Sequence, residues 1–153
     1  MVIPDFLTRG DGISIVSPAS SIIPDYVNGS VNILDGWALS VNIALNCFGK
    51  DGYYSGTIDE RMSDFRHALY DPAVKAVLCS RGGYGAVHLL DGLTDDIARN
   101  PKWIIGFSDI SALHALCVSR GVMSLHAPMC KHLTTEPADN RCTHYLRQIL
   151  FGE

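Results

Sequence analysis

The chain has 153 residues, of which 47% are apolar, so it is long and apolar enough for one domain with its own core. Its 12 basic and 16 acidic side chains give a net charge of −4 and are scattered along the chain, which argues against nucleic acid or a membrane surface as a partner. Residues 1–10 lack the basic and apolar regions of a signal peptide, and no run of 18 uncharged apolar residues follows. We therefore expect a cytoplasmic protein.

In the first half of the chain, short apolar runs alternate with amphipathic segments. The pattern predicts strands over Gly12–Ser17 and Trp37–Ile43, helices over Pro24–Asp35 and Thr57–Tyr70, and a loop over Asn46–Gly56. Thr57 with Glu60 three residues later is typical of a capping box, and Asp71-Pro72 should end the helix that follows it.

The second half of the chain repeats this alternation. We predict strands over Val74–Cys79, Lys102–Ile105 and Val122–Leu125, and helices over Ala86–Leu90, Asp109–Ser119 and Asn140–Leu150. In the helix over Asp109–Ser119, the inward residues should be Ile110, Leu113, Ala115 and Leu116. Strands that alternate with helices indicate a single α/β domain over residues 1–153, with a parallel sheet covered by helices on both faces.

The five cysteines form no C-x-x-C pair and are odd in number, so we expect reduced, mostly buried thiols rather than a disulfide framework. The cysteines and histidines near the end of the chain could in principle bind zinc: His126, Cys130, His132, Cys142 and His144. Their spacing is irregular, and we predict no metal site.

Two loops fall at the carboxyl ends of predicted strands, where sites form in open parallel sheets. The first, Arg81–Gly85, contains three glycines and could form an anion-binding nest of backbone N–H groups. It lacks the third glycine of a dinucleotide fingerprint and the Gly-Lys-Ser/Thr of a P-loop. The alternative is a tight turn between a strand and a helix.

The second loop is Gly106-Phe107-Ser108-Asp109, between a predicted strand and a predicted helix. A serine on such a sharp turn is held away from the sheet, and the N–H of the next residue can stabilise an oxyanion, as in a nucleophile elbow. The alternative is that Ser108 is only the N-cap of the helix. The G-x-S-x-G pattern is also broken, since Ile110 stands at the position of the second glycine.

A nucleophilic serine needs a base, and no histidine of this sequence is convincing in that role. His114 lies six residues after Ser108 on the same predicted helix and should point away from it. His126 ends the next predicted strand, but beside Ala127-Pro128 a structural histidine is the commoner outcome. The other four should be surface or partly buried residues: His67, His88, His132 and His144.

Taken together, these motifs resemble the N-terminal half of the LD-carboxypeptidase family of serine peptidases, which includes the microcin C immunity peptidases. The resemblance rests on Gly10–Ile13 with Val16 and Pro18, Asp71-Pro72 with Val74–Ala76, Arg81–Gly85, Asn100–Lys102, Gly106–Ile110 with Ala112–His114, and His126–Met129. It spans nearly the whole chain and implies a flavodoxin-like sheet.

The resemblance also implies roles for the two loops. Ser108 would be the nucleophile, and the backbone N–H groups of Asp109 and Gly83 would form the oxyanion hole. We expect Arg81, Gly82 and Tyr84 to contact the substrate. Family members release terminal D-alanine from cell-wall tetrapeptides during murein recycling in the cytoplasm, and they need no metal or organic cofactor.

Family members are about twice as long as this chain and carry their catalytic glutamate and histidine in a C-terminal domain. The resemblance therefore implies a nucleophile-bearing domain that is inactive alone, with the missing domain, or a second copy of the chain, as a protein partner. One alternative is an immunity-type peptidase that cleaves a microcin C-like acyl-nucleotide. Another is a non-catalytic domain that binds a small ligand or a partner chain.

Overall fold

The computed structural model describes residues 1–137 and 139–153 and contains a five-stranded parallel sheet. The strand order is β2-β1-β3-β4-β5, with bounds β1 (Gly12–Val16), β2 (Ser40–Ile43), β3 (Val74–Cys79), β4 (Trp103–Gly106) and β5 (Leu125–His126). This is the flavodoxin-like order, and it confirms the predicted fold class. In such a sheet β3 and β4 are neighbours, so the loops that follow them lie side by side.

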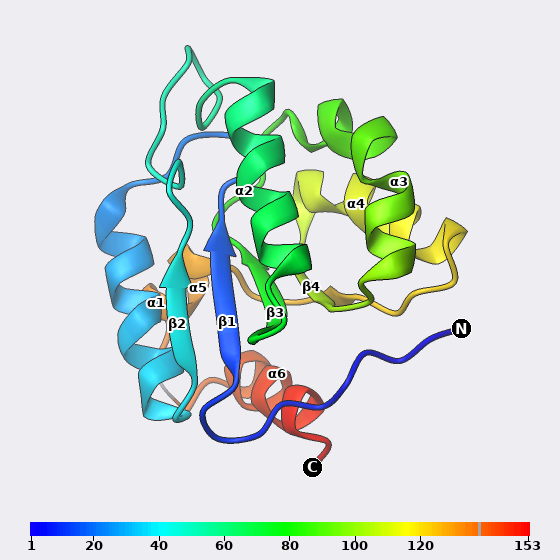
Figure 1. The fold of residues 1–153 in the computed structure, drawn as a ribbon. Coiled ribbons are helices and arrows are strands. Elements are labelled where there is room, and N and C mark those ends of the chain that lie inside the picture. The colour runs from blue at the N-terminus through cyan, green and yellow to red at the C-terminus, as the bar shows by residue number, and fades with distance from the viewer. Residues whose placement is uncertain (138) are drawn as a thin grey trace.

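Helices cover both faces of the sheet, as Figure 1 shows. The α-helices are α1 (Pro24–Gly36), α2 (Ile58–Tyr70), α3 (Leu90–Arg99), α4 (Ser111–Ser119), α5 (Cys130–Thr135) and α6 (Arg141–Phe151), with short 3₁₀ helices η1 (Ala86–Leu89) and η2 (Ser108–Ile110). One apolar core lies between the sheet and α2, α3 and α4. The other lies between the sheet and α1, α5 and α6.

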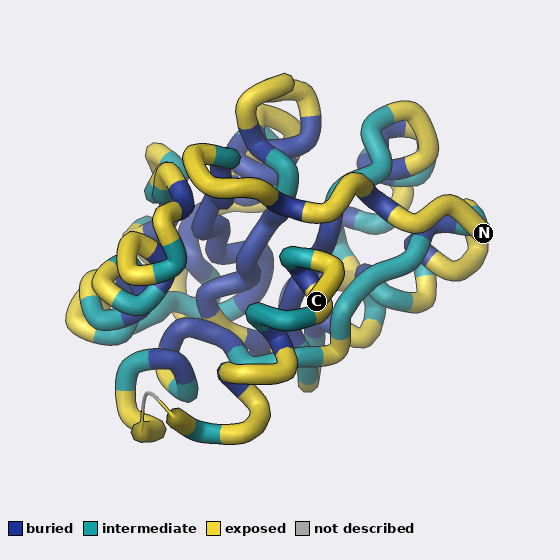
Figure 2. The backbone as a smooth tube through the Cα atoms, turned by 90° about the horizontal axis from the view of Figure 1, so that it is seen from below, coloured by how far each residue is buried: buried dark blue, intermediate teal, exposed yellow. Residues whose placement is uncertain are grey.

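The central strands supply both cores because alternate side chains point to opposite faces of a sheet. In β3, Val77 and Cys79 pack toward α2–α4, whereas Ala76 and Leu78 pack toward α1, α5 and α6. Figure 2 shows the resulting continuous buried interior beneath exposed loops. Near-continuous apolar strands are the expected result when helices cover both faces.

The start of α2 follows the sequence signal closely. Thr57 accepts a hydrogen bond from the N–H of Glu60, and the Glu60 carboxylate accepts one from the N–H of Thr57, so the predicted capping box is present. Asn140 similarly caps α6, accepting from the N–H of Cys142. The first residues of α2 and α6 were predictable because the capping contacts join residues two or three positions apart.

Two strand predictions were wrong in their bounds. Residues 37–39 are not part of β2, since Trp37 is the C-cap of α1 and Ala38 has a φ of +60°. The last strand is only Leu125–His126, whereas Val122 instead forms an isolated bridge with Val2 from the N-terminal segment. An apolar run does not show where the preceding helix ends, nor that Val122 pairs with a residue at the other end of the chain.

The helix predictions missed α3 and α5, and one inward residue was wrong. Beyond Leu90 the chain continues into α3, whose buried Leu93 and Ile97 are four residues apart. On α4 Ala115 is exposed, and Cys117 takes the inward position instead. Cys117 lies four residues after the buried Leu113 and shares its helix face, whereas Ala115 is only two residues after Leu113 and points to solvent.

All five cysteines are free, and four of them are buried, as predicted: Cys47, Cys79, Cys117 and Cys130. Burial raises the pKa of Cys47 to about 11 and that of Cys130 to about 12, so these thiols stay protonated near neutral pH. Across residues 1–137 and 139–153, no helix has the length and apolar character needed to cross a bilayer.

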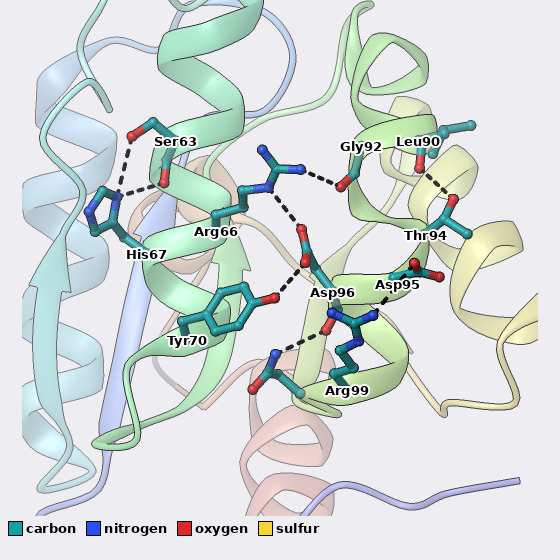
Figure 3. Close-up of polar contacts among 11 residues, drawn as sticks. Ser63, Arg66, His67, Tyr70, Leu90, Gly92, Thr94, Asp95, Asp96 and Arg99 are labelled. Atoms are coloured by element: carbon teal, nitrogen blue, oxygen red, sulfur yellow. Dashed lines mark hydrogen bonds and ion pairs between the residues drawn. The ribbon is translucent and has the colours of Figure 1, made fainter.

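A polar cluster joins α2 to α3 at the surface of the first core (Figure 3). Asp96 accepts hydrogen bonds from Arg66 Nε at 2.8 Å and from the Tyr70 hydroxyl at 2.6 Å. The Tyr70 contact, and then the Arg66 contacts, hold the pKa of Asp96 below its usual range. Asp95 on the same helix makes only a 3.8 Å ion pair with Arg99, and both side chains are largely exposed.

We expect Asp96→Ala to lower the free energy of unfolding by about 1–2 kcal/mol, because two partly buried side-chain hydrogen bonds, from Arg66 and Tyr70, are lost. Asp95→Ala should change it by less than about 0.5 kcal/mol, since exposed ion pairs contribute little. Urea unfolding of both variants measures the difference.

The pH dependence of the Asp96 effect has a defined sign. A carboxylate with a lowered folded-state pKa stabilises above its unfolded-state value and loses that contribution as the pH falls. The gap between the wild type and Asp96→Ala should therefore shrink below pH 3.8, the ordinary value for this group. A gap that stayed constant down through that range would contradict the assignment.

Candidate functional site

Ser108 lies on a sharp turn directly after β4, which we call the elbow (residues 106–109). Its φ is +62°, whereas the preceding Phe107 is extended, and its side chain is exposed at the carboxyl edge of the sheet. A positive φ is strained for a residue with a Cβ and costs about 1 kcal/mol or more. Such strain at an exposed serine is the geometry expected of a nucleophile elbow.

The glycine loop (residues 81–85), which follows β3, lies directly against the elbow. A Cβ built on Gly82 would be 3.0 Å from Ser108 Cβ, 3.2 Å from Ser108 Oγ and 3.2 Å from the backbone N of Asp109. Because residue 82 has no side chain, the glycine loop can pack this closely against the Ser108 hydroxyl and the Asp109 amide. Gly82 and Ser108 also line the same cavity.

The next residue, Gly83, is fixed by the loop that follows β1. Its φ is +101°, and a Cβ there would lie 2.1 Å from Ser20 Oγ. Ser20 also accepts a hydrogen bond from the N–H of Tyr84 and donates its own N–H to the carbonyl of Gly82. The position therefore requires glycine, both for its backbone conformation and for its contact with Ser20.

The side chain of Asp109 connects the elbow to the end of the glycine loop. Its Oδ2 accepts a hydrogen bond from the N–H of Ala86 at 2.9 Å. Asp109 thus presents its amide near Ser108 while its carboxylate holds the first residue of η1. The two loops are bonded to each other through this contact.

Arg61 of α2, which the sequence analysis did not single out, fastens three loops at this edge. It is 2% exposed and donates to the carbonyl oxygens of Pro18 at 2.8 Å, Gly85 at 2.9 Å and Gly56 at 3.3 Å. Its guanidinium lies 5.0 Å from the centre of the Tyr54 ring. Burial lowers the pKa of Arg61, while the nearby Tyr54 and Asp109 act in the opposite direction.

A cavity of ≈ 360 Å³ opens beside Ser108, between α1, α5 and the two loops. Its lining residues are Ile22, Ile23, Tyr26, Ser80, Arg81, Gly82, Gly83, Phe107, Ser108, Met129, Lys131 and His132. Of the predicted substrate contacts it brings together Arg81 and Gly82, but Tyr84 packs outside it against Tyr54 and His88. A larger cavity, of ≈ 670 Å³, lies along β2 and α2, away from Ser108.

The histidine nearest in sequence to the elbow has a structural role. His114 Nε2 is 2.9 Å from the carbonyl oxygen of Gly106, and its Nδ1 is 2.8 Å from Ser124 Oγ. Since a carbonyl only accepts, Nε2 carries the proton, and Nδ1 accepts from Ser124. Burial lowers the pKa of His114, and both of its ring nitrogens are engaged by Gly106 and Ser124.

Two further imidazoles lie near Phe107. His126 is exposed and 5.8 Å from the Phe107 ring, in a second cavity of ≈ 440 Å³ that Ser108 does not line. His132 packs against the same ring at 4.9 Å and lines both cavities. Among the described residues, no hydrogen bond joins an imidazole to Ser108 Oγ.

The cysteines and histidines weighed as zinc ligands do not gather around a common centre. Within the part of the chain that the structure describes, no three His, Cys, Asp or Glu side chains are arranged to hold a metal ion. Cys130 is buried in the core between the sheet and α1, α5 and α6, whereas Cys142 is exposed. His132, two residues after Cys130, lines two cavities instead of the core.

Comparisons with known proteins agree with this geometry. The sequence model of the LD-carboxypeptidase N-terminal domain matches residues 13–127. A curated relative from Synechocystis sp. is 37% identical over 133 residues, which cover 86% of this chain and 44% of the relative. The murein tetrapeptide carboxypeptidase of Pseudomonas aeruginosa is 32% identical over 127 residues, covering 82% of this chain and 41% of that enzyme.

The fold comparison points the same way. The crystal structure of an MccF-like protein from Bacillus anthracis superposes with a TM-score of 0.87 at 30% identity, covering 98% of this chain and 47% of that one. This chain therefore spans about half the length of the relatives it matches.

The strain at Ser108 predicts a stability gain when it is relieved. Ser108→Gly should raise the free energy of unfolding by about 1 kcal/mol relative to Ser108→Ala, because glycine adopts a positive φ without a Cβ penalty. Chemical denaturation measures the difference between the two variants.

Two control substitutions show what glycine does at a strained position and at an unstrained helical position. Ala38→Gly, at the second non-glycine residue with positive φ, should be stabilising to a similar extent. Ala112→Gly, inside α4, should instead be destabilising by about 0.5–1 kcal/mol. If Ser108→Gly behaved like Ala112→Gly, the elbow would not be strained.

Proposed function

This chain belongs to the LD-carboxypeptidase family, and from that premise we propose that it is the nucleophile-bearing domain of a serine carboxypeptidase. The observation that carries the proposal is the exposed, strained Ser108, which lies against Gly82 of the glycine loop and lines a cavity together with it. The bond cleaved is the L,D-peptide bond before the terminal D-alanine of a cell-wall tetrapeptide. We place this reaction in murein recycling in the cytoplasm.

We assign the chemistry to these residues from the family resemblance, and the closeness of the elbow to the glycine loop supports the assignment. Ser108 Oγ attacks the scissile carbonyl carbon and loses its proton to a base, forming a tetrahedral intermediate. The backbone N–H groups of Asp109 and Gly83 donate to its oxyanion. Collapse of the intermediate expels D-alanine, whose amine takes up the proton, and water then hydrolyses the acyl-enzyme.

The base is the part of the triad that we assign to the other half of the protein. Both ring nitrogens of His114 are engaged by Gly106 and Ser124, and His126 lies in a separate cavity. His132 lines the cavity beside Ser108 but packs against Phe107, and no hydrogen bond between it and Ser108 is present among the described residues. We therefore propose that a Glu/His pair outside this chain activates Ser108, so that residues 1–153 alone turn over poorly. A second domain, or a second copy of this chain, would supply the base or cover the cavity beside Ser108.

The resemblance to an MccF-like protein supports a second candidate reaction, cleavage of a microcin C-like acyl-nucleotide. Both reactions use the same nucleophile and oxyanion donors and differ in the group bound beside them. Competition between a tetrapeptide and an acyl-sulfamoyl nucleotide, assayed with the form made by the native host, separates the two.

The proposal predicts the behaviour of Ser108→Ala. The protein in the form that its native host produces should release D-alanine from L-Ala-D-Glu-meso-diaminopimelate-D-Ala, and Ser108→Ala should lower kcat about a thousandfold or more. Intact mass of that form establishes which chain is assayed, and D-alanine release is followed by mass spectrometry.

The same assay on residues 1–153 tests the location of the base. We expect release close to that of Ser108→Ala, because loss of the base from a triad removes most of its catalysis. Rapid release by the 153-residue chain, abolished by Ser108→Ala, would contradict an external base and point to His132 or His126. A fully active Ser108→Ala variant of the native form would overturn the nucleophile assignment.

A further inference from the structure

The cavity beside Ser108 has a charge opposite to that of the chain. The protein carries a net charge of −4, yet the ionisable side chains of this cavity include Arg81, Lys131 and His132, and none of the described residues that line it is acidic. Both Arg81 and Lys131 are exposed, and no acidic lining residue opposes their attraction for an anionic group.

The two permanent cations of this cavity each have a contact of their own within the domain. Arg81 donates from Nη1 to the carbonyl of Ser21 at 2.9 Å, which anchors its guanidinium and leaves further N–H donors for a ligand. Lys131 Nζ lies 5.9 Å from the centre of the Tyr26 ring, over α1. Each cation therefore has a contact that restrains it near the cavity.

The helix that carries Lys131 is itself firmly packed. The hydroxyl of Thr134 donates to the carbonyl of Tyr26 at 2.6 Å, and a Cβ on Gly29 would lie 2.3 Å from Thr134. Cys130 and Leu133 on the same helix are buried in the core. Lys131 is thus presented from a fixed element rather than from a loose loop.

The reaction proposed above places an anion close to Ser108. In a substrate cut one residue from its end, three bonds separate the scissile carbonyl carbon from the terminal carboxyl carbon, a span of at most about 4 Å. A group that binds that carboxylate must therefore line the same cavity as the nucleophile. Arg81 and Lys131 satisfy this requirement.

We infer that Arg81 and Lys131 form the subsite for the free α-carboxylate of the substrate's terminal residue, and that Lys131 makes the cavity selective for carboxyl-terminal peptides. The inference rests on the proposed function and adds the residues that limit it to a carboxypeptidase. Ile22, Ile23 and Met129 of the same cavity provide an apolar surface for a small side chain on that residue.

The test measures binding by this chain, so it does not depend on turnover. N-acetyl-L-Ala-D-Ala and its carboxyl-terminal amide are titrated by calorimetry or NMR into the wild type and into Lys131→Met. We expect the wild type to bind the acid about tenfold more tightly than the amide, and Lys131→Met to reduce that ratio to about threefold or less.

Lys75→Met is the matched control. Lys75 lies near the start of β3, at the opposite end of the strand from the glycine loop, and pairs with Asp5. Lys75→Met removes the same charge from the chain as Lys131→Met, but the tenfold preference for the acid over the amide should remain. Arg81→Lys, which keeps the charge, should retain more of the preference than Arg81→Met.

Three results would overturn the subsite: equal binding of acid and amide by the wild type, no detectable binding of the acid at millimolar concentration, or an unchanged ratio in Lys131→Met. Adenosine monophosphate is titrated as a third ligand. If it bound with the same dependence on Lys131 while the acid showed no preference over the amide, the subsite would be one for phosphate rather than for a peptide carboxylate.

This outcome is separable from that of the proposed function. A carboxylate preference that depends on Lys131, in a protein whose native form releases no D-alanine, would keep the subsite and reject the peptidase. D-alanine release that is lost in Ser108→Ala, with KM unchanged in Lys131→Met, would keep the peptidase and reject the subsite.

Discussion

A Cβ on Gly82 would lie 3.0 Å from Ser108 Cβ and 3.2 Å from Asp109 N, so the two loops of the site meet only because residue 82 has no side chain. The sheet order makes this meeting possible, since β3 and β4 are adjacent and parallel and end at the same edge. Given that arrangement, the strained φ of Ser108 is what turns its hydroxyl toward the glycine loop rather than into the core.

Buried polar contacts hold the loops in this arrangement. Arg61 satisfies its buried guanidinium with carbonyl oxygens from three separate loops, which offsets the cost of removing the charge from water. Its position follows from the capping box one turn earlier, because Thr57 and Glu60 fix where α2 begins. A local sequence signal thereby sets a contact with Gly85, 24 residues away.

The sequence was most informative where the determining contacts are short in range. The capping box of α2 was predicted from neighbouring residues, and the strand alternation sufficed for the sheet class. Neighbouring residues also located the glycine loop and the elbow, but they left a tight turn and a simple N-cap open as alternatives. Arg61, Lys131 and α5 were missed because an isolated cation or a six-residue helix has no periodic signal. Val122 was misassigned because its partner, Val2, lies at the other end of the chain.

The proposed reaction divides between groups that bind the substrate and a group that moves its proton. In this proposal Ser108, the amide donors and the two cations all belong to this domain, and contacts within it hold Arg81 and Asp109 in place. His114 adds rigidity but not basicity, since its ring is occupied on both nitrogens and burial lowers its pKa. In the reaction that we propose, carboxylate recognition and proton transfer are therefore physically separate. The first uses the cavity beside Ser108, and the second uses a base that we assign to a part of the protein outside this domain.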